Sequence, residues 1–165
     1  MFQHHDLLMT IAQVASTFAG FSGIIGVFRR GDSLSESDMG ALQVRDVVEI
    51  SVSVTGLALL PFIPDGFGIA EGISWRLSSG VAAIVLICGF TAAMRRVRMS
   101  AGAITAADPL LFRVALAILG TAQVALWINV LGVAQNAAAT LYVSALYLAL
   151  AHAGFMFVRL LTPRK

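Results

Sequence analysis

The chain has 165 residues, of which 58% are apolar and only 12% are charged, and its mean hydropathy is +0.87. This composition leaves too little polar surface to keep a globule of this length in water, so it excludes a soluble globular domain. The formal net charge is +2 and the isoelectric point is near 9.2. Because the basic residues stand singly or in small groups beside apolar stretches, anionic lipid headgroups explain them, and we expect no nucleic-acid partner.

Five apolar stretches are long enough to cross a bilayer, because a helix that rises ~1.5 Å per residue needs about 20 residues for a ~30 Å hydrocarbon core. They are residues 7–28, 42–63, 73–94, 110–133 and 138–161. We therefore predict an all-α fold, in which one domain over residues 1–165 forms a bundle of five transmembrane helices. The first stretch is expected to remain as a span, since residues 1–6 carry no Lys or Arg as a signal peptide would.

The basic residues predict the orientation of this bundle. Ten of the eleven Lys and Arg residues fall on one side of the five-span arrangement, and only Arg76 falls on the other. Short segments rich in Lys and Arg stay in the cytoplasm, so the pattern predicts an outside N-terminus and an inside C-terminus.

Turn-forming residues predict where the spans connect. Pro61 and the segment Pro64-Asp65-Gly66 are expected to end the second helix and begin an outer loop. Trp75 is expected to mark the outer headgroup level at the start of the third span. The short segment 134–137 is expected to join the last two spans in a tight antiparallel hairpin.

The first span carries a face made of small residues. Ala12, Ser16 and Gly20 recur at every fourth position, and Ala19 and Gly23 lie in the neighbouring column. Small side chains let two helices approach closely, which is how helices associate in lipid. The partner of this face is either another span of the same chain or another protein, a second copy included.

The segment Gly20-Phe-Ser-Gly23, together with His152 in the fifth span, resembles the Gly-x-Ser-Gly motif and the histidine of rhomboid intramembrane proteases. Counted from the inner ends of their spans, Ser22 and His152 differ in depth by only ~5 Å. Catalysis would also require an orienting group and oxyanion donors, for which the sequence offers only Gln123 or Asn129. The six spans of rhomboids are absent as well. We therefore expect a non-enzymatic protein in which Ser22 packs between helices.

Ionisable residues inside the spans are better functional candidates, because each costs ~2.5–3.5 kcal/mol at mid-bilayer unless it faces protein or water. In the second span, a stripe with helical spacing consists of Arg45, Glu49, Ser53 and Gly56. In the fifth span, a second stripe consists of Tyr142, Ala145, Ala149, His152, Met156 and Arg159. If both stripes face the interior, they bring Glu49 and His152 together in the cytoplasmic half of the bundle.

A structural interpretation of this polar interior is that its charges neutralise one another. Glu49 then pairs with Arg45 or with Arg113, and Asp46 pairs with an arginine at positions 29–30. The histidine of the fifth span would be a neutral core residue with a hydroxyl or carbonyl partner. Residues this close to the headgroups reach water readily, so such pairs cost little.

A functional interpretation is that the same residues form a path for ions or protons. A histidine suits such a path, because its ordinary pKa of about 6.5 lies close to physiological pH. The candidate path residues are Glu49, His152, Arg45, Arg113, Gln123 and Gln13, with Thr17 and Thr121 as hydroxyl steps.

No metal site and no cofactor are expected. The single cysteine, Cys88, lies inside the third span, so a disulfide within the chain or a cysteine cluster cannot form. His4, His5 and Asp6 are competent metal ligands, but side chains of adjacent residues do not point at one ion.

Several segments carry a resemblance that covers most of the chain. They are the stretch from Phe18 to Arg30, Val44-Arg-Asp-Val-Val-Glu49, Leu59-Leu-Pro61 and Ser74-Trp-Arg76. With these segments the chain resembles a group of small bacterial integral membrane proteins of unknown function. The resemblance implies a multi-pass protein of the bacterial inner membrane, and it assigns no catalytic or binding residue.

Three functional hypotheses follow, in order of preference. The first is an oligomeric channel or transporter for ions, protons or small solutes. The second is an accessory protein that docks on another membrane protein through the small-residue face of the first span. The third is an intramembrane serine hydrolase that uses Ser22 and His152. The expected partners are the lipid bilayer and either further copies of the chain or another membrane protein.

Overall fold

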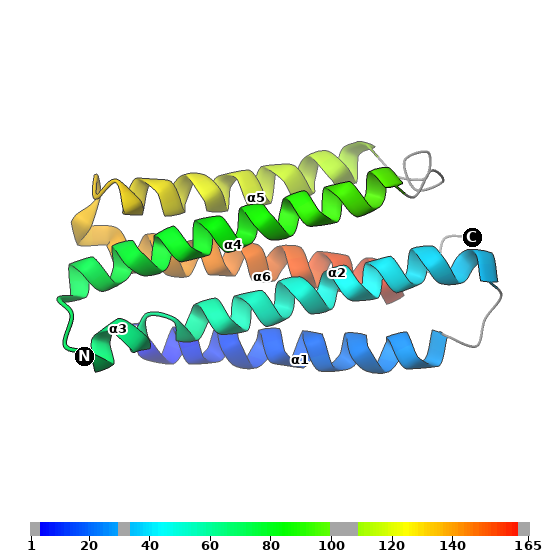
Figure 1. Cartoon of the computed structure of the whole chain (residues 1–165), viewed down its shortest axis with the longest axis horizontal. Helices are drawn as coiled ribbons and strands as arrows, with labels where there is room; N and C mark the ends of the chain where they lie inside the picture. Colours follow the sequence, from blue (N-terminus) through cyan, green and yellow to red (C-terminus); the bar gives the residue numbers. More distant parts are fainter. Residues whose placement is uncertain (1–3, 30–33, 100–108, 162–165) are drawn as a thin grey trace.

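The computed structural model describes residues 4–29, 34–99 and 109–161, and every regular element in these ranges is helical (Figure 1). The elements are α1 (His5–Arg29), α2 (Leu34–Leu59), α3 (Phe62–Gly66), α4 (Glu71–Met99), α5 (Pro109–Val130), the 3₁₀ turn η1 (Gln135–Ala137) and α6 (Ala138–Leu161). Five of them, α1, α2, α4, α5 and α6, are long and apolar enough to cross a membrane. The predicted all-α bundle with five candidate spans is confirmed, and it indicates a multi-pass membrane protein.

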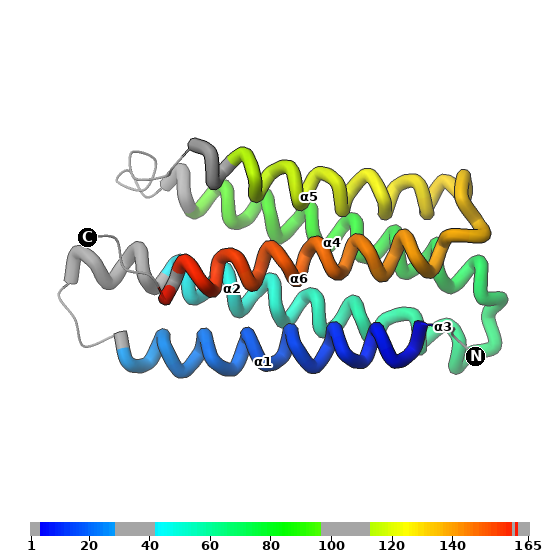
Figure 2. The backbone as a smooth tube through the Cα atoms, turned by 180° about the vertical axis from the view of Figure 1, so that it is seen from behind, coloured from blue at the N-terminus to red at the C-terminus, as the bar shows by residue number. Residues whose placement is uncertain are grey.

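The five long helices lie side by side with α6 in the middle (Figures 1 and 2). Helix α6 contacts each of the other four long helices, and it is the most buried of the five. The pair α1 and α2 lies on one side of it, and the pair α4 and α5 lies on the other. Every pair of consecutive long helices is antiparallel, as short connections require.

The two ends of the bundle differ in charge. At one end α1, α4 and α6 finish while α2 and α5 begin, and we call it the basic end (Figure 1). The arginines with described side chains near this end are Arg45, Arg95, Arg96, Arg113 and Arg159. The opposite end holds the start of α4, the short helix α3 and the turn between α5 and α6. These arginines, which contribute to the charge asymmetry of the sequence, therefore lie together at one end of the folded bundle.

Helix α2 ends at Leu59, close to Pro61, as predicted. Proline has no backbone N–H to donate, so it cannot continue the helical hydrogen-bond pattern. The prediction of an outer loop directly after it is wrong, because Pro64, Asp65 and Gly66 lie within α3. The reason is that proline is tolerated in the first turn of a helix, where its missing donor would have no partner.

Glycines in a left-handed conformation end two of these helices. Gly68 has a φ of 71° after α3, and Gly132 has a φ of 68° after α5. After α5, the Gly132 N–H donates to the carbonyl of Asn129, and the Val133 N–H donates to the carbonyl of Ile128. This is a Schellman motif, which only a residue able to adopt positive φ closes without strain. Helix α5 therefore ends at Val130, three residues before the predicted span end at 133.

The core of the opposite half is closely packed around two aromatic residues. Trp75 is only 2% exposed, and its ring centroid lies 5.6 Å from that of Tyr142. The Tyr142 hydroxyl donates a 2.6 Å hydrogen bond to the carbonyl of Leu57, which ties α6 to α2. Trp75, which the sequence predicts at the outer headgroup level, lies in the first turns of α4 with its side chain buried, and its indole N–H donates to Glu71 Oε1 at 3.3 Å.

A buried amide joins three helices at the same end. Asn129 of α5 is 1% exposed, and its Nδ2 donates to Ser79 Oγ of α4 at 2.7 Å and to the carbonyl of Ala138 at 2.9 Å. A polar side chain inside lipid must find such partners, because water is absent there. The opposite half of the bundle is thus held by both close packing and interhelical hydrogen bonds.

The hydrogen bond from Tyr142 to Leu57 can be tested with a matched pair of variants. Tyr142→Phe should lower the free energy of unfolding by about 1 kcal/mol, because the buried carbonyl loses its side-chain donor. Tyr147→Phe, on a side chain in the same helix that is 44% exposed, should change it by less than about 0.5 kcal/mol. Unfolding in mixed micelles would measure both values, and equal effects would contradict a stabilising role for this bond.

Candidate ligand-binding cavity

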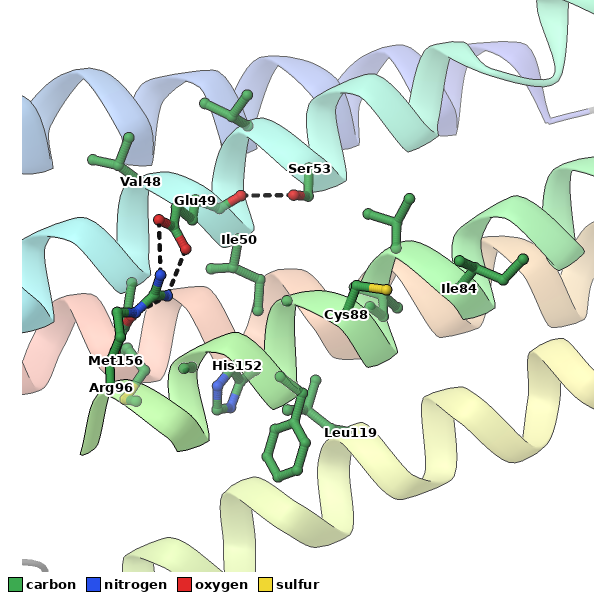
Figure 3. Close-up of a pocket in the computed structure, with 17 residues that line it drawn as sticks. Val48, Glu49, Ile50, Ser53, Ile84, Cys88, Arg96, Leu119, His152 and Met156 are labelled. Atoms are coloured by element: carbon green, nitrogen blue, oxygen red, sulfur yellow. Dashed lines mark hydrogen bonds and ion pairs between the residues drawn. The ribbon is translucent and has the colours of Figure 1, made fainter. Parts of the chain in front are cut away.

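A cavity of about 670 Å³ lies between α2, α4, α5 and α6 in the half of the bundle nearer the basic end (Figure 3). Its walls are mostly apolar, with Ile50 and Val52 from α2, Ile84 and Val85 from α4, and Leu119 from α5 among them. The polar residues that line it are Asp46, Glu49, Ser53, Cys88, Arg96 and His152. The cavity is therefore an apolar space with a charged group at one end.

The charged end is an ion-pair network between α2 and α4. Arg96 of α4 donates to Glu49 from both terminal guanidinium nitrogens, with Nη2–Oε2 at 2.6 Å and Nη1–Oε1 at 3.2 Å (Figure 3). The same Nη2 donates to Asp46 Oδ1 at 2.9 Å. Arg45 donates from Nε to Glu49 Oε1 at 2.6 Å. A bidentate arginine and carboxylate pair is among the stronger charge-assisted contacts, so this network joins two helices that otherwise enclose a cavity.

Helical spacing explains why α2 presents these groups together. Residues three and four positions apart lie on one face of a helix, which places Asp46 and Glu49 side by side toward α4 and places Arg45 next to Glu49. The side chains of Asp46 and Arg96 are 19% and 20% exposed, whereas those of Glu49 and Arg45 are 40% and 62% exposed. Asp46 and Arg96 thus form the inner part of the network, and Arg45 forms its outer edge.

His152 lies on the α6 wall of the cavity (Figure 3). The residue is only 7% exposed, and its Nδ1 has no hydrogen-bond partner in the described part of the chain. The structural interpretation from sequence expected a hydroxyl or carbonyl partner, and Nδ1 has none. A buried polar atom without a hydrogen bond lowers the stability of the fold. Because this atom lies beside a cavity, a ligand bound there would supply the missing partner.

The structure brings some of the predicted path residues together and leaves others apart. Glu49 and His152 line one cavity, and Arg45 belongs to the network at its end. Arg113 is exposed on α5 and has no ion pair with any described residue, so the partner of Glu49 across the bundle is Arg96 instead. Gln13 is exposed on α1, away from the cavity.

The hydroxyl and amide groups predicted as outer steps of a path donate hydrogen bonds to backbone carbonyls of the bundle. The Thr17 and Thr121 hydroxyls each donate to a backbone carbonyl four residues earlier in their own helices. The Gln123 amide donates to the carbonyl of Ala83 at 3.3 Å, and its Oε1 is buried without a described partner. Among the residues that the structure describes, these groups do not extend the cavity toward the opposite end.

The polar stripe predicted for α2 is only partly correct. Ser53 and Glu49 line the cavity, but Arg45 and Gly56 are exposed. The buried face of α2 is formed instead by Val47, Ser51, Val54 and Ala58. The stripe predicted for α6 is correct in its inner part, because Tyr142, Ala145, Ala149 and His152 are all buried.

Arg96, the centre of the network, is not among the residues predicted from the sequence. Arg96 stands 47 residues from Glu49, and a pairing across that separation leaves no periodic pattern. Asp46 was expected to pair with Arg29 or Arg30, whose side chains lie outside the described residues, and it binds Arg96. A usable signal was present, since Arg96 lies on the third span near the same end of the bundle at which the second span carries its two acids.

The small-residue face of α1 is divided between two environments. Ala12 is buried against the bundle, and Ser16 Oγ lies 3.3 Å from Thr55 Oγ1 of α2. Ala19 is partly buried, whereas Gly20 and Gly23 are exposed, and a Cβ built on either glycine would meet nothing within 4 Å. The close approach to α2 occurs at a different glycine, Gly26, where a Cβ would lie 2.9 Å from Val44 Cγ1.

Ser22 and His152 do not form a dyad in this structure. Ser22 Oγ and His152 Nδ1 are both buried, and neither has a hydrogen-bond partner among the described residues. Ser22 does not line the cavity that contains His152. His5 lies beside Asp6 and the ring of Phe62, and in the described ranges no three His, Cys, Asp or Glu side chains are grouped as metal ligands.

Comparison with protein-family models, with curated proteins and with solved structures found no match for this chain.

The two arginines bound to Glu49 should differ in their effect on stability. Arg96→Gln should lower the free energy of unfolding by ~2 kcal/mol, between the values for exposed and buried pairs, because it leaves two carboxylates facing one another. Arg45→Gln should cost less than about 0.5 kcal/mol, as exposed pairs one helical turn apart do.

A double variant provides the control for this comparison. Adding Asp46→Asn to Arg96→Gln should restore part of the lost stability, since it removes one of the two facing charges. Equal losses for the two arginine variants in a micelle unfolding assay would show that the network does not hold α2 to α4.

Proposed function

We propose that this protein is a transporter of the bacterial inner membrane that binds an amphipathic organic solute in the cavity between α2 and α4. The observation that carries the proposal is the cavity itself. Its volume of about 670 Å³ falls within the ~300–1,000 Å³ of ligand pockets. Its lining also has the composition of such pockets, in which mostly apolar walls carry a few polar groups that fix the orientation of the ligand.

The rim residues support access to the cavity from the side of the bundle. Val52 of α2 is 58% exposed and Ile84 of α4 is 59% exposed, and both line the cavity. Each lies near the middle of a candidate span, far from the helix ends. In a bilayer, such a position faces lipid, so an amphipathic solute would enter from the hydrocarbon phase.

The rest of the interior supports a solute carrier over an ion channel. Toward the opposite end, the bundle is filled by Trp75, Tyr142, Leu126 and Leu146, each at most 2% exposed. The buried polar side chains toward that end include Asn129 and Ser79, which are hydrogen-bonded to each other inside the packed core and do not line the cavity. A site that is closed toward one end of the bundle is what alternating access requires of a carrier in one of its states.

The cavity residues have distinct roles in this proposal. Glu49, Asp46 and Arg96 place fixed charges at one end, where a polar headgroup would lie. His152 offers Nδ1, which has no described partner, to a polar group of the solute. No covalent step is assigned to any of them, and the proposed function is non-enzymatic.

The orientation proposed for the transporter is an outside N-terminus and an inside C-terminus. It is supported by the arginines gathered at the basic end, which would lie at the cytoplasmic headgroups. The resemblance to small bacterial membrane proteins supports the inner membrane as the location. The cavity would then open in the cytoplasmic half of the bilayer.

A cavity-filling variant tests the transporter proposal. Gly89 lines the cavity, and a Cβ at this position would meet nothing within 4 Å, so Gly89→Leu should fill the cavity without disturbing the fold. In liposomes that contain short-chain phospholipids with a fluorescent NBD label, the wild type should move the label from the inner to the outer leaflet, where dithionite quenches it. Gly89→Leu should abolish this movement.

The matched control is Gly120→Leu. Gly120 is also an exposed helical glycine at which a Cβ would meet nothing within 4 Å, but it does not line the cavity. Its variant should move the label as the wild type does. Absence of label movement in the wild type, or full activity in Gly89→Leu, would contradict the proposal.

A second candidate function is docking on another membrane protein, a further copy of the chain included. It is favoured by one observation, namely that Gly20 and Gly23 are exposed and unoccupied on α1. Exposed glycines on a helix in lipid leave the backbone open to close approach by another helix. This function does not exclude transport, since many transporters act as oligomers.

Leucine substitutions separate the two uses of glycine on α1. Gly20→Leu and Gly23→Leu should leave the folded monomer intact and reduce association, because the bulk is added on the outer face. Gly26→Leu should instead destabilise the monomer, because it collides with Val44. Crosslinking in membranes and unfolding in micelles would measure the two effects, and unchanged association in both outer variants would remove the docking hypothesis.

A further inference from the structure

A second pocket, of about 480 Å³, adjoins the cavity at the basic end. It is lined by three arginines, Arg45, Arg95 and Arg96, together with Cys88, Thr91 and Ala92. Arg96 and Cys88 also line the first cavity, so the two spaces meet at these residues. The combined site has an apolar part between α2 and α4 and a cationic part at its basic end.

The cationic part keeps hydrogen-bond donors that the ion-pair network does not use. Arg96 gives its two terminal nitrogens to Glu49 and Asp46, but its Nε is buried and has no described partner. Arg95 is exposed and has no ion pair with a residue that the structure describes. Three guanidinium groups here face two carboxylates, so the region has a net positive charge. Guanidinium groups bind phosphate well, because their fork of donors matches its oxygens.

The apolar part has the length of a lipid chain in one leaflet. It extends along α4 from Arg96 to Ile84, which at 1.5 Å per residue is about 18 Å. One leaflet contributes about half of the ~30 Å hydrocarbon core. An acyl chain with its headgroup at the arginines would therefore reach along the whole groove, with Val52 and Ile84 at its open side.

We propose that the occupant of this combined site is an anionic phospholipid from the leaflet at the basic end of the bundle. Its phosphate lies against Arg45, Arg95 and Arg96, and an acyl chain lies in the cavity between α2 and α4. This inference rests on the proposed function and names its substrate class. A zwitterionic lipid would bring a cationic group to a region that is already positive, so the site selects lipids with a net negative headgroup.

Cys88 provides a built-in reporter, because it lines both spaces and is the only cysteine of the chain. The purified full-length protein in a neutral detergent would be titrated with dioleoyl phosphatidylglycerol, dioleoyl phosphatidylcholine or inorganic phosphate. The rate at which N-ethylmaleimide labels Cys88 would be followed by intact-mass measurement. Phosphatidylglycerol should slow the labelling at much lower concentration than phosphatidylcholine, and inorganic phosphate should not slow it.

Two arginine variants make the test specific. Arg95→Gln should weaken protection by phosphatidylglycerol about fivefold, because one basic residue near an anionic lipid surface contributes about that factor. Arg113→Gln is the matched control, since Arg113 is an exposed arginine near the same end that lines neither space, and it should leave protection unchanged.

Three results would overturn the inference: equal protection by the two lipids, protection by inorganic phosphate alone, or no effect of Arg95→Gln. The outcomes for the transporter proposal are separate from these. Selective protection without movement of labelled lipid between leaflets would retain the lipid site and remove transport. Movement of both lipids with equal efficiency would retain transport and remove the selectivity for anionic headgroups.

Discussion

Close packing of small side chains around α6 is the constraint on which the bundle depends. In lipid, apolar side chains gain little by leaving their surroundings, so helices associate where their backbones can approach closely. Ala145, Ala149 and Ala153 of α6 are fully buried, and this narrow helix is reached by all four of its neighbours. Between α2 and α4 the packing is incomplete, and the structure has a cavity there, lined by small residues such as Ser53 and Gly89 as well as by Ile50 and Ile84.

The ion-pair network is a consequence of that arrangement. Where side-chain packing does not fill the space between α2 and α4, Arg96 reaches across and binds both Glu49 and Asp46. At the other end, the hydrogen bond from Tyr142 to Leu57 holds α2 to α6. Helix α2 is thus held to α4 near its middle and to α6 near its C-terminal end, and part of the cavity lies between these two points. A ligand in this place would contact fixed charges at one end and adaptable apolar walls elsewhere.

The sequence predicts the number and type of helices well, because the length and hydropathy of a span are properties of consecutive residues. The ends of α5 and the short α3 depend on single backbone conformations, such as the positive φ of Gly132, which hydropathy does not report. Half of the candidate site could also be predicted, since helical spacing placed Glu49 and His152 on inner faces. For Arg96, the sequence indicates the end of the bundle at which it lies but not its partner, because the choice of partner depends on how α2 and α4 are rotated toward one another.

Arg76 is the one basic residue that opposes the charge bias of the sequence, and its surroundings reduce the effect of its charge. Its guanidinium lies directly against Gly132, at the point where α5 has just ended. The carbonyl groups at the end of a helix carry a partial negative charge through the aligned peptide dipoles, and a cation placed there is stabilised. The dipole of α5 therefore offsets this charge within the fold. Arg76 therefore adds less positive charge to its end of the bundle than a count of arginines gives.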